Sequence, residues 1–193
     1  MDEVPHNLER AAPEKGGGKA RSMGTLMHLA RLLKPELIRM ELETVNPPET
    51  ESPPPAERIV AQVKESVIRE LADLLDRSGR VGNKTKLFRD LHNREKKAST
   101  GIGRGFAIPH VRTKEAREFL FGFARSTPGV PFEAQDGGLV HIFLAFVSPP
   151  HDDQLYMSFY KRIAEAILTT TVFDDLMSAR NEGEVIRAIK WFD

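Results

Sequence analysis

The chain has 193 residues, and its 28 Lys and Arg balance 28 Asp and Glu, so the formal net charge is zero. This length allows one domain, or one domain with a tail, and the balanced charge argues against a generally basic nucleic-acid binder. The absence of cysteine excludes a disulfide scaffold, a Cys-ligated metal site and a thiol nucleophile.

The N-terminal quarter combines polar, Gly-rich and Pro-rich segments with two short elements. Residues 1–23 are polar and aperiodic, which predicts a disordered tail without the apolar core of a signal peptide. Residues 25–33 fit a short amphipathic helix that stops before Pro35, and residues 38–43 alternate apolar and charged side chains as a half-buried strand does. Residues 46–55 hold five of the 13 prolines and are expected to form a solvated loop.

The middle of the chain alternates predicted helices and strands. Apolar residues recur at helical spacing over 56–76 and again over 84–94. Residues 118–125 place three Phe side chains on one face of a strand. Residues 139–147 are nearly all apolar, as in a strand that is covered on both faces. That run is less than half of the ~20 residues needed to span a bilayer, so we expect a soluble, cytoplasmic protein with no membrane insertion.

The C-terminal third is predicted to be helical. Residues 155–168 are apolar at helical spacing, and Thr171 and Asn181 each stand where a helix-capping side chain is expected. Because strands and helices interleave, the predicted class is α/β, with a mixed β-sheet covered by helices on both faces.

The segment with the most chemical information runs from Arg94 to His110 and contains STGIGRGFAIPH. Gly101, Gly103 and Gly105 allow unusual backbone angles and close approach of a ligand to main-chain N–H groups. Their spacing matches neither a dinucleotide fingerprint nor a P-loop. A tight turn between two elements explains the glycines equally well.

His110 follows Pro109, and a neutral imidazole near pKa ~6.5 has one ring nitrogen free to act as a nucleophile. Beside a Gly-rich loop it could accept a phosphoryl group, with Arg94 and Arg112 balancing the charge. The alternative is a histidine with a structural or surface role.

The whole string resembles the active-site sequence of the fructose/mannitol-class (type 2) IIA component of the bacterial phosphoenolpyruvate-dependent phosphotransferase system, a class that includes the nitrogen-regulatory IIA proteins. The matching elements are an Arg-Glu pair, Ser-Thr-Gly-Ile-Gly, a short apolar strand and Pro-His. The resemblance spans roughly residues 25–193, which we expect to be one IIA domain with the proline-rich segment 46–55 as an insert.

The resemblance implies a role for several residues. The phosphorylated histidine of the family falls on His110, and the arginine near its phosphoryl group falls on Arg94. The segment that would hold the phosphate oxygens falls on Thr100 and the glycines Gly101, Gly103 and Gly105. The implied reaction takes a phosphoryl group from the phosphocarrier protein HPr, or its nitrogen-branch counterpart, and passes it to a separate IIB protein, with no metal and no cofactor.

One position departs from the family pattern. The family usually has a second histidine at the start of the helix after the long apolar strand, and here that position is Tyr156. A phenol can also donate a hydrogen bond to a phosphate oxygen, but it lacks the positive charge of an imidazolium. His151 could substitute if the loop is shaped differently, and Tyr156 could simply pack at the helix start.

Two functions are compatible with these residues. The first is a phosphocarrier that is phosphorylated on His110. The second is a regulatory binding protein whose affinity for a target protein is switched by phosphorylation of His110, without sugar transport. The intact sequence around His110 argues against a third reading, a IIA-like fold that has lost phosphorylation.

Overall fold

The computed structural model describes residues 29–45, 55–169 and 171–193. The sequence motifs that fall on residues 1–23 and 46–54, the predicted tail and most of the proline-rich loop, lie outside the described residues.

In the described residues six strands form one mixed sheet in the order β1-β5-β6-β3-β2, with β4 also paired to β6. Strand β5 runs antiparallel to β6, whereas β1 runs parallel to β5, and β3 and β4 run parallel to β6. The strands are β1 (Leu33–Arg39), β2 (Gly101–Gly103), β3 (Phe106–Ala107), β4 (His110–Arg112), β5 (Leu120–Val130) and β6 (Val140–Ser148).

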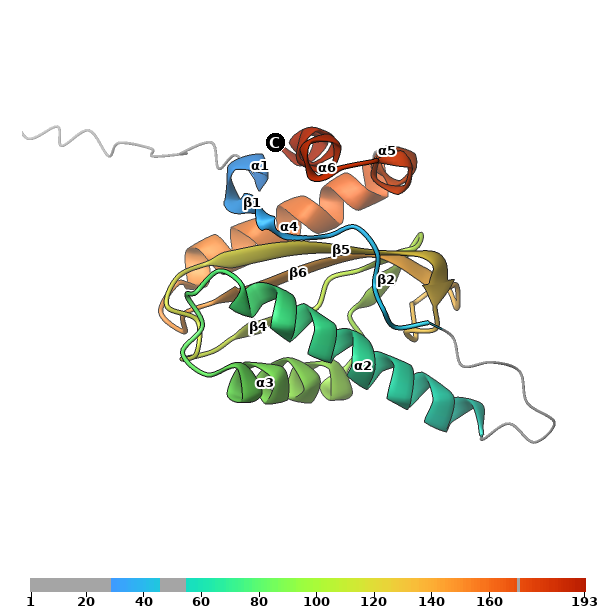
Figure 1. Cartoon of the computed structure of the whole chain (residues 1–193), viewed down its shortest axis with the longest axis horizontal. Helices are drawn as coiled ribbons and strands as arrows, with labels where there is room; N and C mark the ends of the chain where they lie inside the picture. Colours follow the sequence, from blue (N-terminus) through green and yellow to red (C-terminus); the bar gives the residue numbers. More distant parts are fainter. Residues whose placement is uncertain (1–28, 46–54, 170) are drawn as a thin grey trace, which may run out of the picture.

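Helices cover both faces of this sheet, as the sequence predicts (Figure 1). One face carries α2 (Ala56–Asp76) and α3 (Lys84–Lys97). The other carries α4 (Asp153–Thr169), α5 (Val172–Ser178) and α6 (Glu182–Ile189), together with the short α1 (Leu29–Leu32) and a 3-10 turn at Lys190–Phe192.

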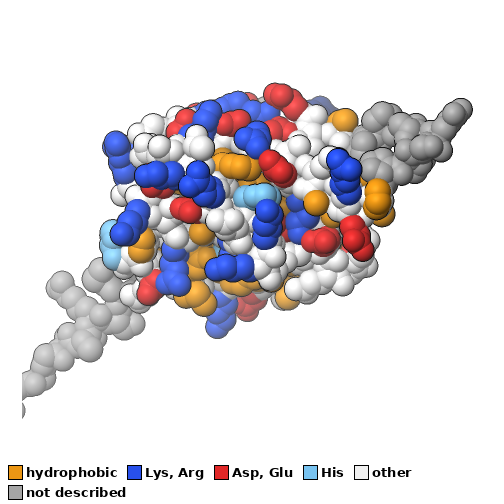
Figure 2. All heavy atoms as spheres, turned by 90° about the horizontal axis from the view of Figure 1, so that it is seen from below, with side chains coloured by type: hydrophobic (Ala, Val, Ile, Leu, Met, Phe, Trp, Pro, Cys, Tyr) orange, Lys and Arg blue, Asp and Glu red, His pale blue; other side chains and the backbone are white. Residues whose placement is uncertain are grey.

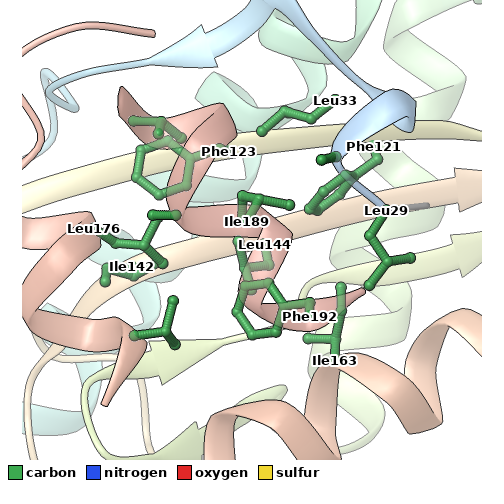
Figure 3. Close-up of a cluster of buried hydrophobic side chains, with 14 of the residues drawn as sticks. Leu29, Leu33, Phe121, Phe123, Ile142, Leu144, Ile163, Leu176, Ile189 and Phe192 are labelled. Carbon is green, nitrogen blue, oxygen red and sulfur yellow. The ribbon is translucent and has the colours of Figure 1, made fainter. Parts of the chain in front are cut away.

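Alternation along β6 divides the core into two clusters. Ile142, Leu144 and Phe146 pack toward α4, α5 and α6, and part of this cluster is drawn in Figure 3. Phe143 and Val147 pack toward α2 and α3. Because successive side chains of a strand point to opposite faces, a nearly continuous apolar run is what a strand buried on both sides requires, and the prediction for 139–147 is confirmed.

The first strand differs from the prediction. The alternation over residues 38–43 predicts it there, whereas β1 begins at Leu33 and passes through Pro35. Within the described sheet β1 is an edge strand, and its register with β5 shifts between Leu33 and Ile38. An edge strand tolerates proline because the missing N–H has no ladder partner to lose.

The two predicted helix caps behave differently. The Asn181 side chain accepts a hydrogen bond from the Glu184 backbone N–H at 3.0 Å, as a capping residue does. Thr171 makes no side-chain capping bond to α5, so its predicted capping role is wrong. Its backbone carbonyl instead accepts from the Asp174 N–H at 3.3 Å, closing the first turn through the main chain.

Candidate functional site

His110 begins β4 and pairs with the C-terminal part of β6, an inner strand of the sheet. It pairs with Phe146 in the parallel ladder between β4 and β6, and the carbonyl of Pro109 accepts the Phe146 backbone N–H at 3.0 Å. The residue is only 7% exposed. The ladder therefore fixes the backbone on which the imidazole stands, and only a small edge of the residue reaches solvent.

Aromatic rings from β6 and α4 surround the imidazole. It stacks on Phe146 with ring centroids 5.3 Å apart, and it meets Tyr156 at 5.7 Å and Tyr160 at 4.9 Å. Sequence reasoning placed Tyr156 near this site and missed Tyr160. The signal was available, because residues four apart on a helix share a face.

The hydrogen bonds of the ring define its tautomer. Nδ1 lies 2.5 Å from the Ile108 carbonyl oxygen, which can only accept, so Nδ1 carries the ring hydrogen. Nε2 then holds the lone pair, and Arg94 Nη2, which can only donate, lies 3.2 Å from it. The nucleophilic atom of His110 is therefore Nε2, and it points toward the guanidinium of Arg94.

The surroundings also fix the charge of the ring. Burial, together with the nearby positive charge of Arg94, lowers the pKa of His110 to about 4, against the opposing effects of the Ile108 hydrogen bond and the Glu95 charge. A histidine with this pKa is neutral at pH 7, so its lone pair is available for attack on phosphorus without prior loss of a proton.

Arg94 and Glu95 are neighbours in the last turn of α3, and their side chains have different partners. The Arg94 side chain turns to His110 and also donates to the Ala98 carbonyl at 2.9 Å. Glu95 is 3% exposed and forms an ion pair with Lys64 at 2.8 Å. A buried carboxylate needs such a partner, so Glu95 anchors the end of α3 from which Arg94 reaches the ring.

Thr100 belongs to this buried anchor. Its hydroxyl donates to Glu95 at 2.6 Å, and its backbone N–H lies 3.2 Å from both carboxylate oxygens. Thr100 itself is 4% exposed. The structure thus gives Thr100 a packing and hydrogen-bonding role, and phosphoryl binding by its side chain remains a prediction.

The three glycines lie on the sheet away from the His110 ring, and no contact joins them to it among the described residues. They form the β2–β3 hairpin, and the Gly105 carbonyl accepts from the N–H groups of His141 and Ile142 at 2.8 and 3.0 Å. His110 lies beside Phe146, so four to five residues of β6 separate it from Gly105, about 13–16 Å at strand rise. Gly101 is nearer, because it pairs with Ala107, which pairs with Phe143, three residues of β6 from Phe146.

Packing explains why these positions are glycine. Gly103 and Gly105 have φ of 91° and 79°, where L side chains are strained. A Cβ on Gly105 would lie 2.5 Å from the Phe173 ring, and one on Gly101 would lie 2.8 Å from the Ala134 backbone. Phosphoryl binding by the glycines stays a prediction.

Tyr156 and Arg112 close the site on the α4 side. The Arg112 guanidinium lies 5.3 Å from the centre of the Tyr156 ring, and Arg112 forms an ion pair with Asp153 at the start of α4. Burial raises the pKa of the Tyr156 phenol, so the hydroxyl keeps its proton and remains a donor. His151 is exposed and lines a different groove, beside Arg117 and Leu155.

Two broader features are absent from residues 29–45, 55–169 and 171–193. No group of three His, Asp or Glu side chains there is placed to hold a metal ion. No helix in these ranges is both long enough and apolar enough to cross a membrane.

Comparison with known sequences identifies the relatives of the chain. A family model described as phosphoenolpyruvate-dependent sugar phosphotransferase system, EIIA 2, matches residues 57–191. The fructose-specific EIIA component of Haloferax volcanii is 28% identical over 75% of this chain and 92% of its own length. The nitrogen regulatory protein of Pseudomonas aeruginosa is 29% identical over 60% of this chain and 75% of its own length. The fructose-specific EIIABC component of Bacillus subtilis is 29% identical over 70% of this chain but only 21% of its own length.

Solved structures share the fold. The nitrogen regulatory protein IIA-Ntr of Neisseria meningitidis superposes with a TM-score of 0.68 at 24% identity, covering 83% of this chain and 98% of that one. The IIA mannitol enzyme of Escherichia coli, in its complex with phosphorylated IIB, gives a TM-score of 0.62 at 17% identity, covering 82% of this chain and 98% of that one.

Proposed function

Since the chain belongs to the EIIA 2 family of the phosphoenolpyruvate-dependent sugar phosphotransferase system, we propose that it is a phosphocarrier whose His110 Nε2 accepts a phosphoryl group. The observation that carries this proposal is the state of His110: a neutral imidazole with Nδ1 held by the Ile108 carbonyl and Nε2 facing Arg94. The donor is an HPr-like phosphocarrier protein, and the acceptor is a separate IIB protein.

The proposed step forms one bond and breaks one. The Nε2 lone pair attacks phosphorus, and the bond between phosphorus and the leaving atom of the donor breaks, with its electron pair returning to the donor. No proton needs to move first, because Nδ1 already carries the ring hydrogen. The ring becomes cationic as the N–P bond forms, and the Ile108 carbonyl stabilises that charge through the hydrogen bond that it already accepts.

Arg94 supplies the positive charge that the phosphoryl group requires. Its Nη2 leaves the Nε2 lone pair as phosphorus approaches and donates to the phosphoryl oxygens instead, which demands only a small shift from 3.2 Å. Tyr156, whose ring meets the imidazole and whose phenol stays protonated, adds a second donor on the α4 side. Arg112 behind it contributes further positive charge.

A regulatory role is the second candidate, favoured by the similarity to nitrogen regulatory proteins and by Tyr156 in place of a second histidine. Phosphorylation adds about two negative charges next to Arg94 and Arg112, which changes the electrostatics of the surface that a target protein would contact. This role uses the same chemistry on His110 and differs only in the fate of the phosphoryl group.

The test is the intact mass of the protein after incubation with phosphoenolpyruvate, enzyme I and the HPr-like protein. Wild type is expected to gain one acid-labile phosphoryl group, and His110→Gln to gain none while keeping the circular dichroism of the wild type. Addition of a IIB protein then separates the two roles, because a transport phosphocarrier loses the group to IIB and a purely regulatory one keeps it. Equal phosphorylation of wild type and His110→Gln would refute the assignment.

A further inference from the structure

Thr100 is joined to the end of α3 by more bonds than a loop residue usually makes. Its hydroxyl donates to the Glu95 carboxylate at 2.6 Å, and its backbone N–H lies 3.2 Å from both carboxylate oxygens. The same carboxylate forms an ion pair with Lys64 of α2 at 2.8 Å. Glu95 therefore ties the segment that follows α3 back onto the helix, and Lys64 holds Glu95 in place.

These bonds differ from the charge pairs on the surface above them. Figure 2 views the molecule from the side on which α2 and α3 lie, and charged side chains of both signs are spread over that face. Lys64, Glu95 and Thr100 are buried instead. Water and salt screen buried charges much less than exposed ones, so this arrangement holds the backbone at Thr100 firmly.

A first path leads from Thr100 to one nitrogen of the His110 ring. The Thr100 carbonyl accepts the Ile108 backbone N–H at 2.9 Å. The carbonyl of Ile108 in turn accepts the hydrogen on His110 Nδ1 at 2.5 Å. One fully buried residue, Ile108, thus connects Thr100 to the bond that sets the tautomer of the ring.

A second path leads to the other ring nitrogen. Arg94 Nη2 lies 3.2 Å from His110 Nε2, while Arg94 Nη1 donates to the Ala98 carbonyl at 2.9 Å. Because a guanidinium is planar and rigid, the carbonyl that holds Nη1 also sets the direction of Nη2. Ala98 lies two residues before Thr100, inside the segment that the bonds between Glu95 and Thr100 close.

We propose that Thr100 is a positioning residue for His110, and that its bonds to Glu95 hold both partners of the imidazole, the Ile108 carbonyl at Nδ1 and Arg94 at Nε2. This inference rests on the proposed function, and it gives Thr100 a task other than binding phosphoryl oxygens. The Thr100 hydroxyl stays on Glu95 throughout the reaction. Such positioning matters because an error of about 1 Å in the placement of a reacting group can slow a reaction about 100-fold.

The test compares three substitutions in the full chain. Thr100→Val keeps the shape of the side chain and removes the hydroxyl, and Thr100→Ser keeps the hydroxyl. The matched control is Thr113→Val, because Thr113 is also buried and its hydroxyl donates to Asp90 of α3 at 2.5 Å, but it lies on neither path.

Two quantities are measured for each protein. One is the rate of phosphorylation by the small donor phosphoramidate, followed by intact mass and expressed per folded molecule, with the folded fraction taken from urea unfolding. The other is the 1H–15N NMR signal of the hydrogen on His110 Nδ1 in the unphosphorylated protein, which reports how the ring is held before any phosphoryl group is present.

We expect Thr100→Val to be phosphorylated about tenfold more slowly, in line with the loss of one hydrogen bond, and to show a shifted Nδ1 signal that exchanges faster with water. Thr100→Ser and Thr113→Val should stay within twofold of the wild-type rate and keep the wild-type signal. Thr100→Ala, which leaves room for a water at the carboxylate, carries the same expectation if Thr100→Val does not fold.

Three results would overturn the positioning role. A slower rate with an unchanged Nδ1 signal would make Thr100 a phosphoryl ligand. Equal losses in Thr100→Val and Thr113→Val would reduce its role to folding, and an unchanged rate in Thr100→Val would leave it without effect on the reaction. Failure of wild-type His110 to accept a phosphoryl group from either phosphoramidate or the HPr-like protein would instead refute the proposed function.

Discussion

The sequence motif that contains the three glycines and His110 is divided between the two ends of β6. The surroundings of His110 at one end differ from those of the glycine hairpin at the other. Beside Phe146, His110 has a neutral ring and a lone pair that faces Arg94, and Arg112 follows it by two residues on β4. Beside His141, the glycine hairpin has its groups occupied: the Gly105 carbonyl accepts two backbone N–H groups, and the Phe173 ring fills the space next to it. An available lone pair that faces a guanidinium distinguishes the end of β6 beside His110, the reactive end. Close packing and positive φ angles distinguish the end beside the glycine hairpin, the structural end.

The largest expected effect is at the reactive end. Arg94→Ala should lower the rate of phosphorylation of His110 by about 10²–10³-fold, because it removes the donor aimed at the developing charge. The loss should appear with the protein donor and with phosphoramidate alike. Arg94→Lys keeps the charge without the planar pair of donors and should recover part of the rate. An Arg94→Ala protein within twofold of wild type would show that Arg94 does not contact the phosphoryl group.

A glycine substitution tests the structural end. Gly105→Ala combines a φ of 79° with a Cβ placed 2.5 Å from Phe173, so it should lower the free energy of unfolding by about 3 kcal/mol. Gly137→Ala is the matched control, because its φ is 71° but no atom lies within 4 Å of the added Cβ; it should cost about 1 kcal/mol.

Urea unfolding measures both glycine variants, and the phosphorylation rate per folded molecule completes the comparison. That rate should match wild type for each. A Gly105→Ala protein that is stable yet fails to accept a phosphoryl group would place the hairpin in the reaction after all.

The pH dependence of stability tests the burial of His110. Its pKa is about 4 in the folded protein and near 6.5 in an unfolded chain, so between these values the unfolded state binds more protons. The free energy of unfolding should therefore decrease as the pH falls from 7 toward 4, by up to about 3 kcal/mol from this group.

The variant His110→Gln isolates this contribution. Its free energy of unfolding should change less between pH 7 and pH 4 than that of wild type, as measured by urea unfolding at a series of pH values. An identical pH dependence in both proteins would mean that the imidazole titrates normally in the folded state.

The smallest effect is expected at Tyr156. Tyr156→Phe keeps the ring that packs on His110 and removes only the hydroxyl, so the phosphorylation rate should fall about tenfold, in line with the loss of one hydrogen bond. Tyr156→His should raise the rate, since an imidazolium adds positive charge beside the phosphoryl group. Wild-type rates in both variants, measured by intact mass over time, would show that Tyr156 only packs there.

Much of the fold could be predicted because periodic burial leaves a direct trace in the sequence. The helix over 56–76 and the strand covered on both faces are confirmed with nearly the expected bounds. The first strand could not be placed, because its tolerance of Pro35 depends on its position at the sheet edge, which is a property of the tertiary arrangement.

The candidate site was also predicted only in part. The sequence points to His110, Arg94 and Tyr156, and the structure brings these three together. The sequence does not reveal that Thr100 is hydrogen-bonded to buried Glu95, because a hydroxyl next to a glycine loop is equally compatible with a structural role and with ligand binding. The distance between the glycines and His110 is likewise set by strand pairing along β6, not by their nearness in the chain.

The central claim, that Nε2 of His110 is the phosphoryl acceptor, is tested most directly by long-range 1H–15N NMR of the imidazole before and after phosphorylation. We predict a neutral ring with hydrogen on Nδ1 at pH 7 in the free protein, and phosphorus on Nε2 after the reaction. A ring with hydrogen on Nε2 in the free protein, or phosphorus on Nδ1 in the phosphorylated one, would contradict it.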